Sequence, residues 1–223
     1  MTYLARHGET ASNRMRRYAG RSAEPLTLAG REQVRELAAR LASCGVTAIW
    51  SSGIARASES AAIIAEALGI PVSADARLDE MRMGPWEGLT EDEVATRYPT
   101  EYGLWNTRPE LLALEGRESL EALAERVMGA VRDAWRQPAP VLLVTHVAPM
   151  RVAALRTLGS SLARYKDVHV PNAGCLVARD GAAAGAWRLG AGDSLCEELQ
   201  GSGVFQADAA LSEGARQSCE RGS

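Results

Sequence analysis

The chain has 223 residues, of which 46% are hydrophobic, and it carries a formal net charge of −3 with an isoelectric point near 5.7. A chain of this size and composition can bury one substantial core. Its slight acidic excess argues against a nucleic-acid-binding surface, which normally carries a clear excess of basic residues. Any anion that the protein binds must be held by a local cluster of cations. We expect arginines in that cluster, because Lys166 is the only lysine.

Strands and helices alternate along the predicted chain. In order, we expect a strand over residues 2–5, a helix around 34–41, a strand at 48–51, a helix at 57–68, an extended stretch near 72, a helix at 120–134, a strand at 141–144 and a helix beginning near Pro149. The helices are recognised by apolar residues at helical spacing, and stop signals follow them at Gly45, Gly69 and Pro138. This alternation predicts an α/β fold, a three-layer sandwich with a mostly parallel central sheet flanked by helices.

Two regions differ in composition from this pattern. Residues 81–116 are rich in tryptophan, tyrosine and proline, which is typical of a cap rather than of a core strand. Residues 194–223 are rich in glycine, serine, alanine and glutamate, with few apolar side chains to anchor them. We therefore expect one catalytic domain over residues 1–193, with a small cap region at about 81–116, and a loosely packed or disordered tail over 194–223.

The four cysteines show neither C-x-x-C spacing nor a dense framework, so we expect reduced thiols rather than a zinc site or a disulfide scaffold. The sequence has no basic-then-apolar leader before its first strand and no apolar run near the eighteen or so residues of a membrane helix. The expected location is the cytoplasm, without membrane or nucleic-acid partners. The sequence gives no indication of the oligomeric state.

Two of the three histidines directly follow predicted buried strands. His7 stands after the first strand in Arg6-His7-Gly8-Glu9, and His146 follows the strand at 141–144. Because the carboxyl ends of strands in an open α/β sheet face the ligand-binding crevice, we expect both histidines in one site. His169 has no comparable context, and we interpret it as structural.

The first of these motifs belongs to a longer series. The segment Leu4–Asn13 resembles the signature of the histidine phosphatase superfamily, which includes cofactor-dependent phosphoglycerate mutases and many small phosphatases. Further segments similar to that family follow in the family's order, at Pro25–Thr27, Ser51–Ala57, Leu78–Glu80, Gly84–Gly88, Gly116–Ser119 and Thr145–His146. An ordered series across residues 1–180 is far more specific than a single short motif.

The residues in these segments suit phosphoryl transfer. A phosphoryl group carries negative charge on its nonbridging oxygens, which Arg6 and Arg56 can neutralise. A neutral imidazole can be the nucleophile, and the resemblance implies this role for His7, with His146 as a clamp on the transferring group. The leaving alkoxide needs a proton. By position the resemblance implies Glu80 as the donor.

Other residues are assigned less directly. Glu87 competes with Glu80 for the role of proton donor, or it has a structural role instead. Glu118 is the next candidate donor. Gly8 permits close approach of the backbone to a ligand, and Asn13 could orient the nucleophile or donate to phosphate. Val147, near a helix start, could offer a backbone N–H to the anion. We therefore expect Gly8, Asn13 and Val147 to bind substrate.

The chain departs from the common family pattern in three places. Many relatives carry glycines after the second histidine, where this chain has Val147-Ala148-Pro149, a variant similar to phosphatases of cobalamin-precursor phosphates or of general phosphomonoesters. Ala23 stands where relatives commonly have an aspartate, and Glu59-Ser60 replaces a more usual Gln-Thr pair. These changes alter the pocket wall and leave the catalytic atoms intact.

The resemblance therefore implies a phosphatase that hydrolyses small-molecule phosphomonoesters through a phosphohistidine intermediate, without a metal or another cofactor. A phosphoglycerate mutase is the nearest alternative, but mutases resemble one another in a longer lysine- and arginine-bearing insert, and the 65 residues between Glu80 and His146 contain no lysine. A phosphate-binding protein without turnover is a further alternative. His7-Gly8-Glu9 also matches the H-x-E element of zinc deaminases, but the P-C-x-x-C pair that they need is absent.

Overall fold

The computed structural model describes residues 1–178 and 188–190, and within them a six-stranded sheet forms the centre. The strands lie in the order β3 (Val72–Ala74), β2 (Ala48–Ser51), β4 (Val141–Thr145), β1 (Thr2–Arg6), β5 (Cys175–Ala178) and β6 (Arg188–Gly190). The first four run parallel, whereas β5 is antiparallel to both β1 and β6. The predicted mostly parallel sheet is confirmed, and β5 and β6 are strands that the sequence analysis missed.

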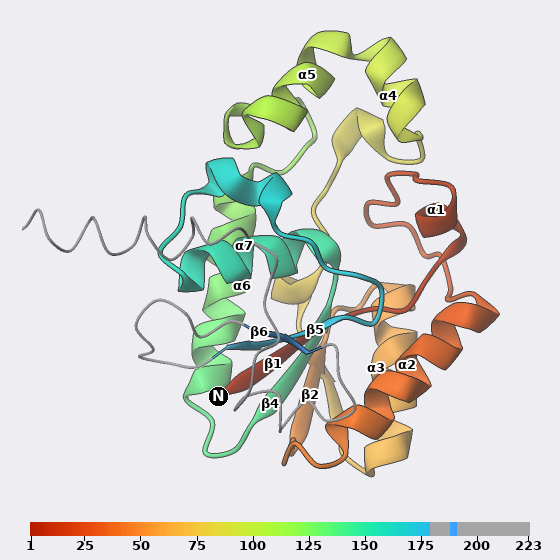
Figure 1. Cartoon of the computed structure of the whole chain (residues 1–223), viewed down its shortest axis with the longest axis vertical. Coiled ribbons are helices and arrows are strands. Elements are labelled where there is room, and N and C mark those ends of the chain that lie inside the picture. Colours follow the sequence, from red (N-terminus) through yellow and green to blue (C-terminus); the bar gives the residue numbers. More distant parts are fainter. Residues whose placement is uncertain (179–187, 191–223) are drawn as a thin grey trace, which may run out of the picture.

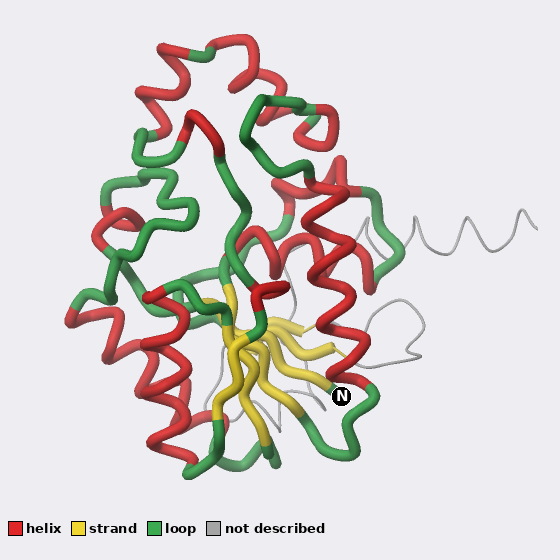
Figure 2. Tube along the Cα trace, turned by 180° about the vertical axis from the view of Figure 1, so that it is seen from behind, coloured by secondary structure: helices red, strands yellow, loops and turns green. Residues whose placement is uncertain are grey.

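Helices cover both faces of this sheet (Figures 1 and 2). One face carries α2 (Leu28–Leu41) and α3 (Ala55–Leu68), and the other carries α6 (Leu120–Trp135) and α7 (Val147–Thr157). Strand β1 serves both layers, because successive side chains of a strand point to opposite faces. Tyr3 and Ala5 pack in the core with α2 and α3, while Leu4 packs in the core with α6 and α7. The predicted three-layer α/β sandwich is confirmed.

Helices α2 and α7 are two of those that begin earlier than predicted. Helix α2 starts after Thr27, whose hydroxyl oxygen accepts the N–H of Gly30 at 2.9 Å and so caps the first turn. Helix α7 begins at Val147, and Pro149 lies within its first turn, where no intrahelical donor is needed. Helix α3 ends where predicted, at Gly69, which takes the left-handed conformation with φ +66°.

Two short helices, α4 (Glu91–Arg97) and α5 (Pro99–Thr107), lie beyond the carboxyl ends of the parallel strands (Figure 1). The fully buried Trp86 contacts the rings of Tyr98, Tyr102 and Trp105, with centroids 6.2 to 6.4 Å apart. These aromatic contacts join the two helices to the preceding loop. The Trp86 ring is thus committed to packing and is not free to stack on a ligand.

The remaining short elements of the described chain are α1 (Ala11–Arg14), η1 (Ala76–Leu78), η2 (Gly84–Trp86), η3 (Pro109–Leu111) and η4 (Leu162–Asp167). The tail that we predict over residues 194–223 lies outside the described residues. Among the helices that are described, none combines the length and the apolar character needed to cross a membrane.

Candidate active site

The two predicted site histidines meet at the carboxyl ends of β1 and β4. Arg6 pairs with Thr145 in the parallel register, and the backbone N–H of His7 donates to the Thr145 carbonyl oxygen at 3.0 Å. The rings of His7 and His146 consequently lie side by side, with centroids 5.1 Å apart. Both side chains are almost fully buried. The sheet topology thus brings residues 139 positions apart into one site.

The hydrogen bonds of His7 define its tautomer. Its Nδ1 lies 2.7 Å from the carbonyl oxygen of Gly8, and because a carbonyl can only accept, Nδ1 carries the proton. The lone pair is then on Nε2, to which Arg56 Nε donates at 3.2 Å. Burial, followed by the charges of Arg6 and Arg56, holds the pKa of His7 well below its usual value. At neutral pH His7 is therefore an uncharged imidazole with an available lone pair on Nε2.

Two arginines line the cavity with His7, the buried Arg56 and the partly buried Arg6. Arg56, in the first turn of α3, is fixed by the carbonyl oxygens of Gly20 at 2.6 Å and Ser22 at 3.0 Å. Arg6 donates from Nη1 to the carbonyl oxygen of Val170 at 2.7 Å, and its buried Nε–H has no partner among the described residues. Burial lowers the pKa of Arg6 to about 10, so that it stays charged at neutral pH. Both guanidinium groups line the same cavity as His7.

A chain of hydrogen bonds also defines the tautomer of His146. Its Nε2 lies 2.9 Å from Ser52 Oγ, which in turn lies 2.8 Å from Asp79 Oδ1 and accepts the N–H of Ile54 at 3.1 Å. The single hydroxyl proton of Ser52 goes to the carboxylate, so Ser52 must accept the proton of His146 Nε2. The buried Nδ1 of His146 has no partner in the described part of the chain. Burial, and then the proximity of His7, lower the pKa of His146 well below its usual value.

Glu80 is buried on the lining of the same cavity. Its Oε1 accepts the backbone N–H of Met81 at 2.8 Å. Burial raises the pKa of Glu80, against the opposing effect of the nearby Arg56 charge. A carboxyl group in this setting keeps its proton to higher pH than a solvated glutamate and can act as an acid.

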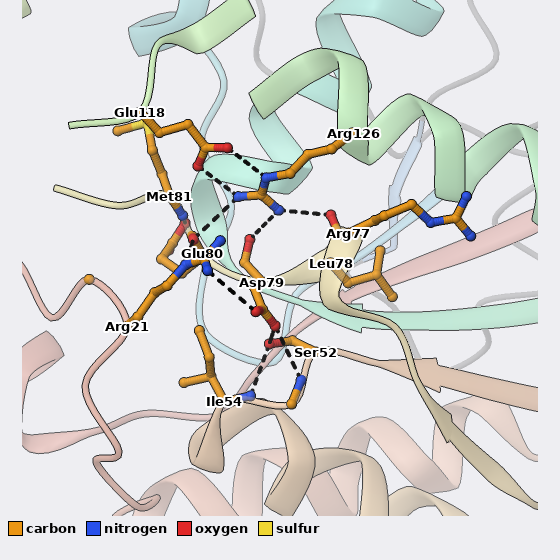
Figure 3. A network of polar contacts seen from close by, with 12 residues as sticks. Arg21, Ser52, Ile54, Arg77, Leu78, Asp79, Glu80, Met81, Glu118 and Arg126 are labelled. Atoms are coloured by element: carbon orange, nitrogen blue, oxygen red, sulfur yellow. Dashed lines mark hydrogen bonds and ion pairs between the residues drawn. The ribbon is translucent and has the colours of Figure 1, made fainter. Parts of the chain in front are cut away.

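The backbone around Glu80 is held by Arg126 of α6 (Figure 3). The Arg126 guanidinium forms two hydrogen bonds with the carboxylate of Glu118, at 2.7 and 2.8 Å. It also donates to the carbonyl oxygens of Arg77 at 2.8 Å, Asp79 at 2.7 Å and Glu80 at 3.3 Å. Arg126 thereby fixes the segment that carries both Asp79, the hydrogen-bond partner of Ser52, and the buried Glu80.

The two competing carboxylates have other partners. Glu118 is bound to Arg126 and is not among the cavity-lining residues. Glu87 Oε1 accepts the N–H of Met83 at 3.1 Å, and its carboxyl group packs so closely on Gly20 that a Cβ there would lie 2.3 Å from Oε1. Glu87 also does not line the cavity. Glu80 alone among the three faces the site.

The three predicted substrate-binding residues differ in position. Val147 and Asn13 line the cavity, although Asn13 Oδ1 is occupied by the N–H of Thr10 at 3.1 Å and by Asn172 Nδ2 at 2.7 Å. Gly8 does not line it. A Cβ at Gly8 would lie 2.2 Å from the carbonyl oxygen of Gly30, so the glycine allows the loop to pack on α2. Substrate binding by Gly8 stays a prediction.

The cavity has a volume of about 440 Å³ and extends from His7 toward α5 and η4. The predicted site residue His146 contacts the His7 ring but is not among the lining residues. Its outer lining includes residues that the sequence analysis did not select, among them Arg16, Arg17, Arg151, Lys166 and His169. His169, which we interpreted as structural, is thus a lining residue. Within the described residues, no group of three or more His, Cys, Asp or Glu side chains is placed to hold a metal ion.

Comparison with known proteins agrees with this geometry. The family model described as "Histidine phosphatase superfamily (branch 1)" matches residues 2–188. Phosphoserine phosphatase 1 of Hydrogenobacter thermophilus is 32% identical over 174 residues, covering 76% of this chain and 82% of that protein. A probable phosphoglycerate mutase GpmB of Salmonella newport is 38% identical over 151 residues, covering 65% of this chain and 68% of that protein.

Solved structures resemble the fold over most of the chain. The YhfR protein of Bacillus stearothermophilus superposes with a TM-score of 0.77 at 28% identity, covering 87% of this chain and 96% of that one. A mycobacterial glucosyl-3-phosphoglycerate phosphatase, solved with VO3, superposes with a TM-score of 0.73 at 26% identity, covering 86% of this chain and 98% of that one.

Proposed function

The chain belongs to the histidine phosphatase superfamily, and on this premise we propose that it hydrolyses small-molecule phosphomonoesters without a metal ion, through a phosphohistidine formed on His7. One observation carries the proposal. A neutral imidazole with its lone pair on Nε2 lines a cavity together with Arg6 and Arg56, and a buried carboxyl group with a raised pKa lines the same cavity. This set supplies a nucleophile, charge neutralisation and a proton donor.

In the first step, Nε2 of His7 attacks phosphorus and the bond to the leaving oxygen breaks. Glu80 gives its proton to that oxygen, so the alcohol leaves neutral. In the free protein the attacking lone pair accepts the Nε–H of Arg56. Substrate binding must therefore redirect this N–H to a phosphoryl oxygen, which frees the nucleophile at the moment when the arginine gains an anionic partner.

In the second step, water attacks the phosphorus of the phosphohistidine. The Glu80 carboxylate takes one proton from this water, the P–N bond breaks, and its electron pair returns to Nε2 of His7. Inorganic phosphate leaves, and Glu80 is again protonated for the next substrate. The Glu80 carboxyl group thus serves as the acid in the first step and as the base in the second. This requires that the leaving oxygen and the attacking water occupy the same place beside it.

Arg6, Arg56 and His146 neutralise the phosphoryl oxygens in this scheme. Because Nε2 of His146 donates to Ser52, its Nδ1 is the atom left to face the anion. When the phosphoryl group binds, its negative charge favours protonation of Nδ1, and the resulting N–H donates to an oxygen. The positive charge that a metal ion supplies in other phosphatases is here supplied by side chains.

A phosphoglycerate mutase is the second candidate, since a relative at 38% identity carries that name. A mutase forms the same phosphohistidine but returns the phosphoryl group to a retained product instead of to water. The relative called phosphoserine phosphatase and the structural neighbour called glucosyl-3-phosphoglycerate phosphatase favour hydrolysis. The absence of lysine between Glu80 and His146 does so as well.

Incubation with 3-phosphoglycerate, primed with a trace of 2,3-bisphosphoglycerate so that a mutase would carry its phosphohistidine, distinguishes the two candidates. We expect release of inorganic phosphate in step with loss of substrate, with the same rate after dialysis against a chelator. Accumulation of 2-phosphoglycerate without phosphate release would identify a mutase. Loss of turnover after chelation, with recovery on addition of magnesium or zinc, would contradict the metal-free mechanism. A panel of other phosphomonoesters, with p-nitrophenyl phosphate as a generic substrate, separates narrow specificity from lack of turnover.

A further inference from the structure

Beside the residues assigned to the phosphoryl group, the lining of the cavity carries a second pair of cations, one from α7 and one from η4. Arg151, on α7, donates from Nε to the carbonyl oxygen of Val168 at 2.7 Å, and its guanidinium carbon lies 5.0 Å from the ring centroid of Tyr165. Lys166, on η4, holds its Nζ 4.3 Å from the ring centroid of Trp105. Both cations line the cavity. Aromatic rings therefore position both charges without neutralising them.

Neither cation forms an ion pair with a carboxylate of the described residues, whereas Arg16 and Arg17 on the same lining do. The one carboxylate at the rim, Glu91, is paired with Arg16. Burial is the main cause that lowers the pKa of Lys166 to about 8; the charge of Arg151 acts in the same direction, and the charge of Glu91 opposes it. The two cations thus repel each other in a partly desolvated place, an arrangement that is unfavourable unless an anion lies beside them.

The phosphoryl group does not supply this anion. It is already met in the cavity by Arg6, Arg56 and His7, whose ring lies against that of His146. The volume of about 440 Å³ holds a small metabolite rather than a phosphoryl group alone. A flat aromatic leaving group is disfavoured at the outer end, because the Trp105 ring is in contact with the cationic groups of Arg117 and Lys166.

We propose that Arg151 and Lys166 bind a second anionic group on the leaving-group side of the substrate, so that the preferred substrates are small phosphomonoesters that also carry a carboxylate or a second phosphate. This inference rests on the proposed phosphatase activity and adds the substrate class to it. The two cations act as specificity determinants: they contact a part of the substrate that does not react.

Two matched substrate pairs test the inference. 3-Phosphoglycerate and glycerol 3-phosphate differ only in a carboxylate against a hydroxymethyl group, and propanediol 1,3-bisphosphate and propanediol monophosphate differ only in the second phosphate. We expect the wild-type protein to favour the anionic member by about tenfold to a hundredfold in kcat/KM, as for a hydrogen bond to a charged group. The pair with the larger ratio identifies the carboxylate or the phosphate as the preferred group.

Lys166→Met should reduce that ratio to within about threefold of unity, and Lys166→Arg should restore most of it. Arg164→Met is the matched control, because Arg164 lies on the same short helix, pairs with Asp167 at 2.8 Å and does not line the cavity. The ratio is measured within each variant, so partial loss of folded protein does not affect it.

The outcomes separate the two proposals. A wild-type ratio near unity, together with brisk hydrolysis of p-nitrophenyl phosphate, overturns the second-anion site and leaves the phosphatase proposal standing. An unchanged ratio in Lys166→Met places the discrimination elsewhere and also overturns it. No hydrolysis of any phosphomonoester by the wild-type protein contradicts the proposed function itself.

Discussion

Replacing Glu80 by glutamine tests the proton donor directly. The substitution keeps the size of the side chain, and the amide oxygen can still accept the N–H of Met81 that Oε1 accepts now, at 2.8 Å. It removes only the proton that the buried carboxyl group can release. The variant should therefore fold, bind phosphate and form the phosphohistidine on His7, but without general acid assistance to the leaving oxygen.

The size of the effect depends on the leaving group. An alkoxide is strongly basic and needs protonation as the P–O bond breaks, so loss of the acid should cost about 10²–10⁴-fold in kcat/KM, or roughly 3–5 kcal/mol of transition-state stabilisation. A nitrophenolate leaves without help, and its rate should fall far less. The raised pKa of Glu80 supports a large effect, since it keeps the acid protonated at higher pH than a solvated carboxyl group.

The assay measures kcat/KM for a series of phosphomonoesters whose leaving groups span alkyl alcohols to nitrophenol. This parameter reports phosphoenzyme formation even if breakdown of the phosphohistidine limits kcat. In Glu80→Gln the dependence on leaving-group basicity should become much steeper. Glu87→Gln is the matched control, because Glu87 binds the N–H of Met83 outside the cavity, and it should affect all substrates alike. An equal loss across the series in Glu80→Gln would refute the assignment.

Three further outcomes are expected. His7→Ala should abolish the acid-labile, base-stable phosphoenzyme that rapid quenching traps in the wild type, and label on another residue would contradict the nucleophile. With increasing pH, kcat/KM should rise as His7 loses its proton, well below pH 6.5, and fall as Glu80 loses its proton, above pH 4.5. The fall should be absent in Glu80→Gln. If the fall persists in that variant, it belongs to another group. Ser52→Ala, which leaves His146 without its acceptor, should lower kcat/KM for all esters by about fivefold to a hundredfold. The neighbouring Ser51 donates its hydroxyl proton only to the carbonyl oxygen of Ser52, so Ser51→Ala should have little effect. If both variants lose the same kcat/KM, Ser52 does not orient His146.

The fold could be predicted where apolar periodicity and stop signals agree. Gly69 ends α3 as expected, since only a residue that tolerates positive φ closes a helix in this way. Helix boundaries set by caps were less accurate: the first turn of α2 precedes its apolar face and depends on the hydroxyl of Thr27. Strand β5 is as uniformly apolar as β4, but no predicted helix leads into it and no motif follows it, so it was missed; pairing with β1 across the chain makes it a strand.

Site residues could be predicted where the residue type and its position after a strand indicate a role. They could not be predicted where the role depends on contacts with residues far away in the sequence. His7 and His146 follow buried strands, so the topology brings them together. Arg126 carries no motif of its own, and its role arises from hydrogen bonds to carbonyl oxygens up to 49 residues away. The packing role of Gly8 could not be predicted, because the Gly30 carbonyl oxygen that excludes a side chain there lies on another element.

The reaction needs a positively charged site that attracts the anionic substrate and, within it, a nucleophile that is uncharged. Arg6 and Arg56 contribute to both requirements. Arg6 and Arg56 attract the anionic substrate, and their charges also help to hold the pKa of His7 below its usual value. A more basic imidazole would be the stronger nucleophile but would be protonated near neutral pH. A carboxylate beside His7 would raise its basicity but repel phosphate. Burial among cations, with the Nδ1 proton held by the Gly8 carbonyl oxygen, gives a nucleophile that is uncharged before the substrate arrives and directed at the place where the anion must bind.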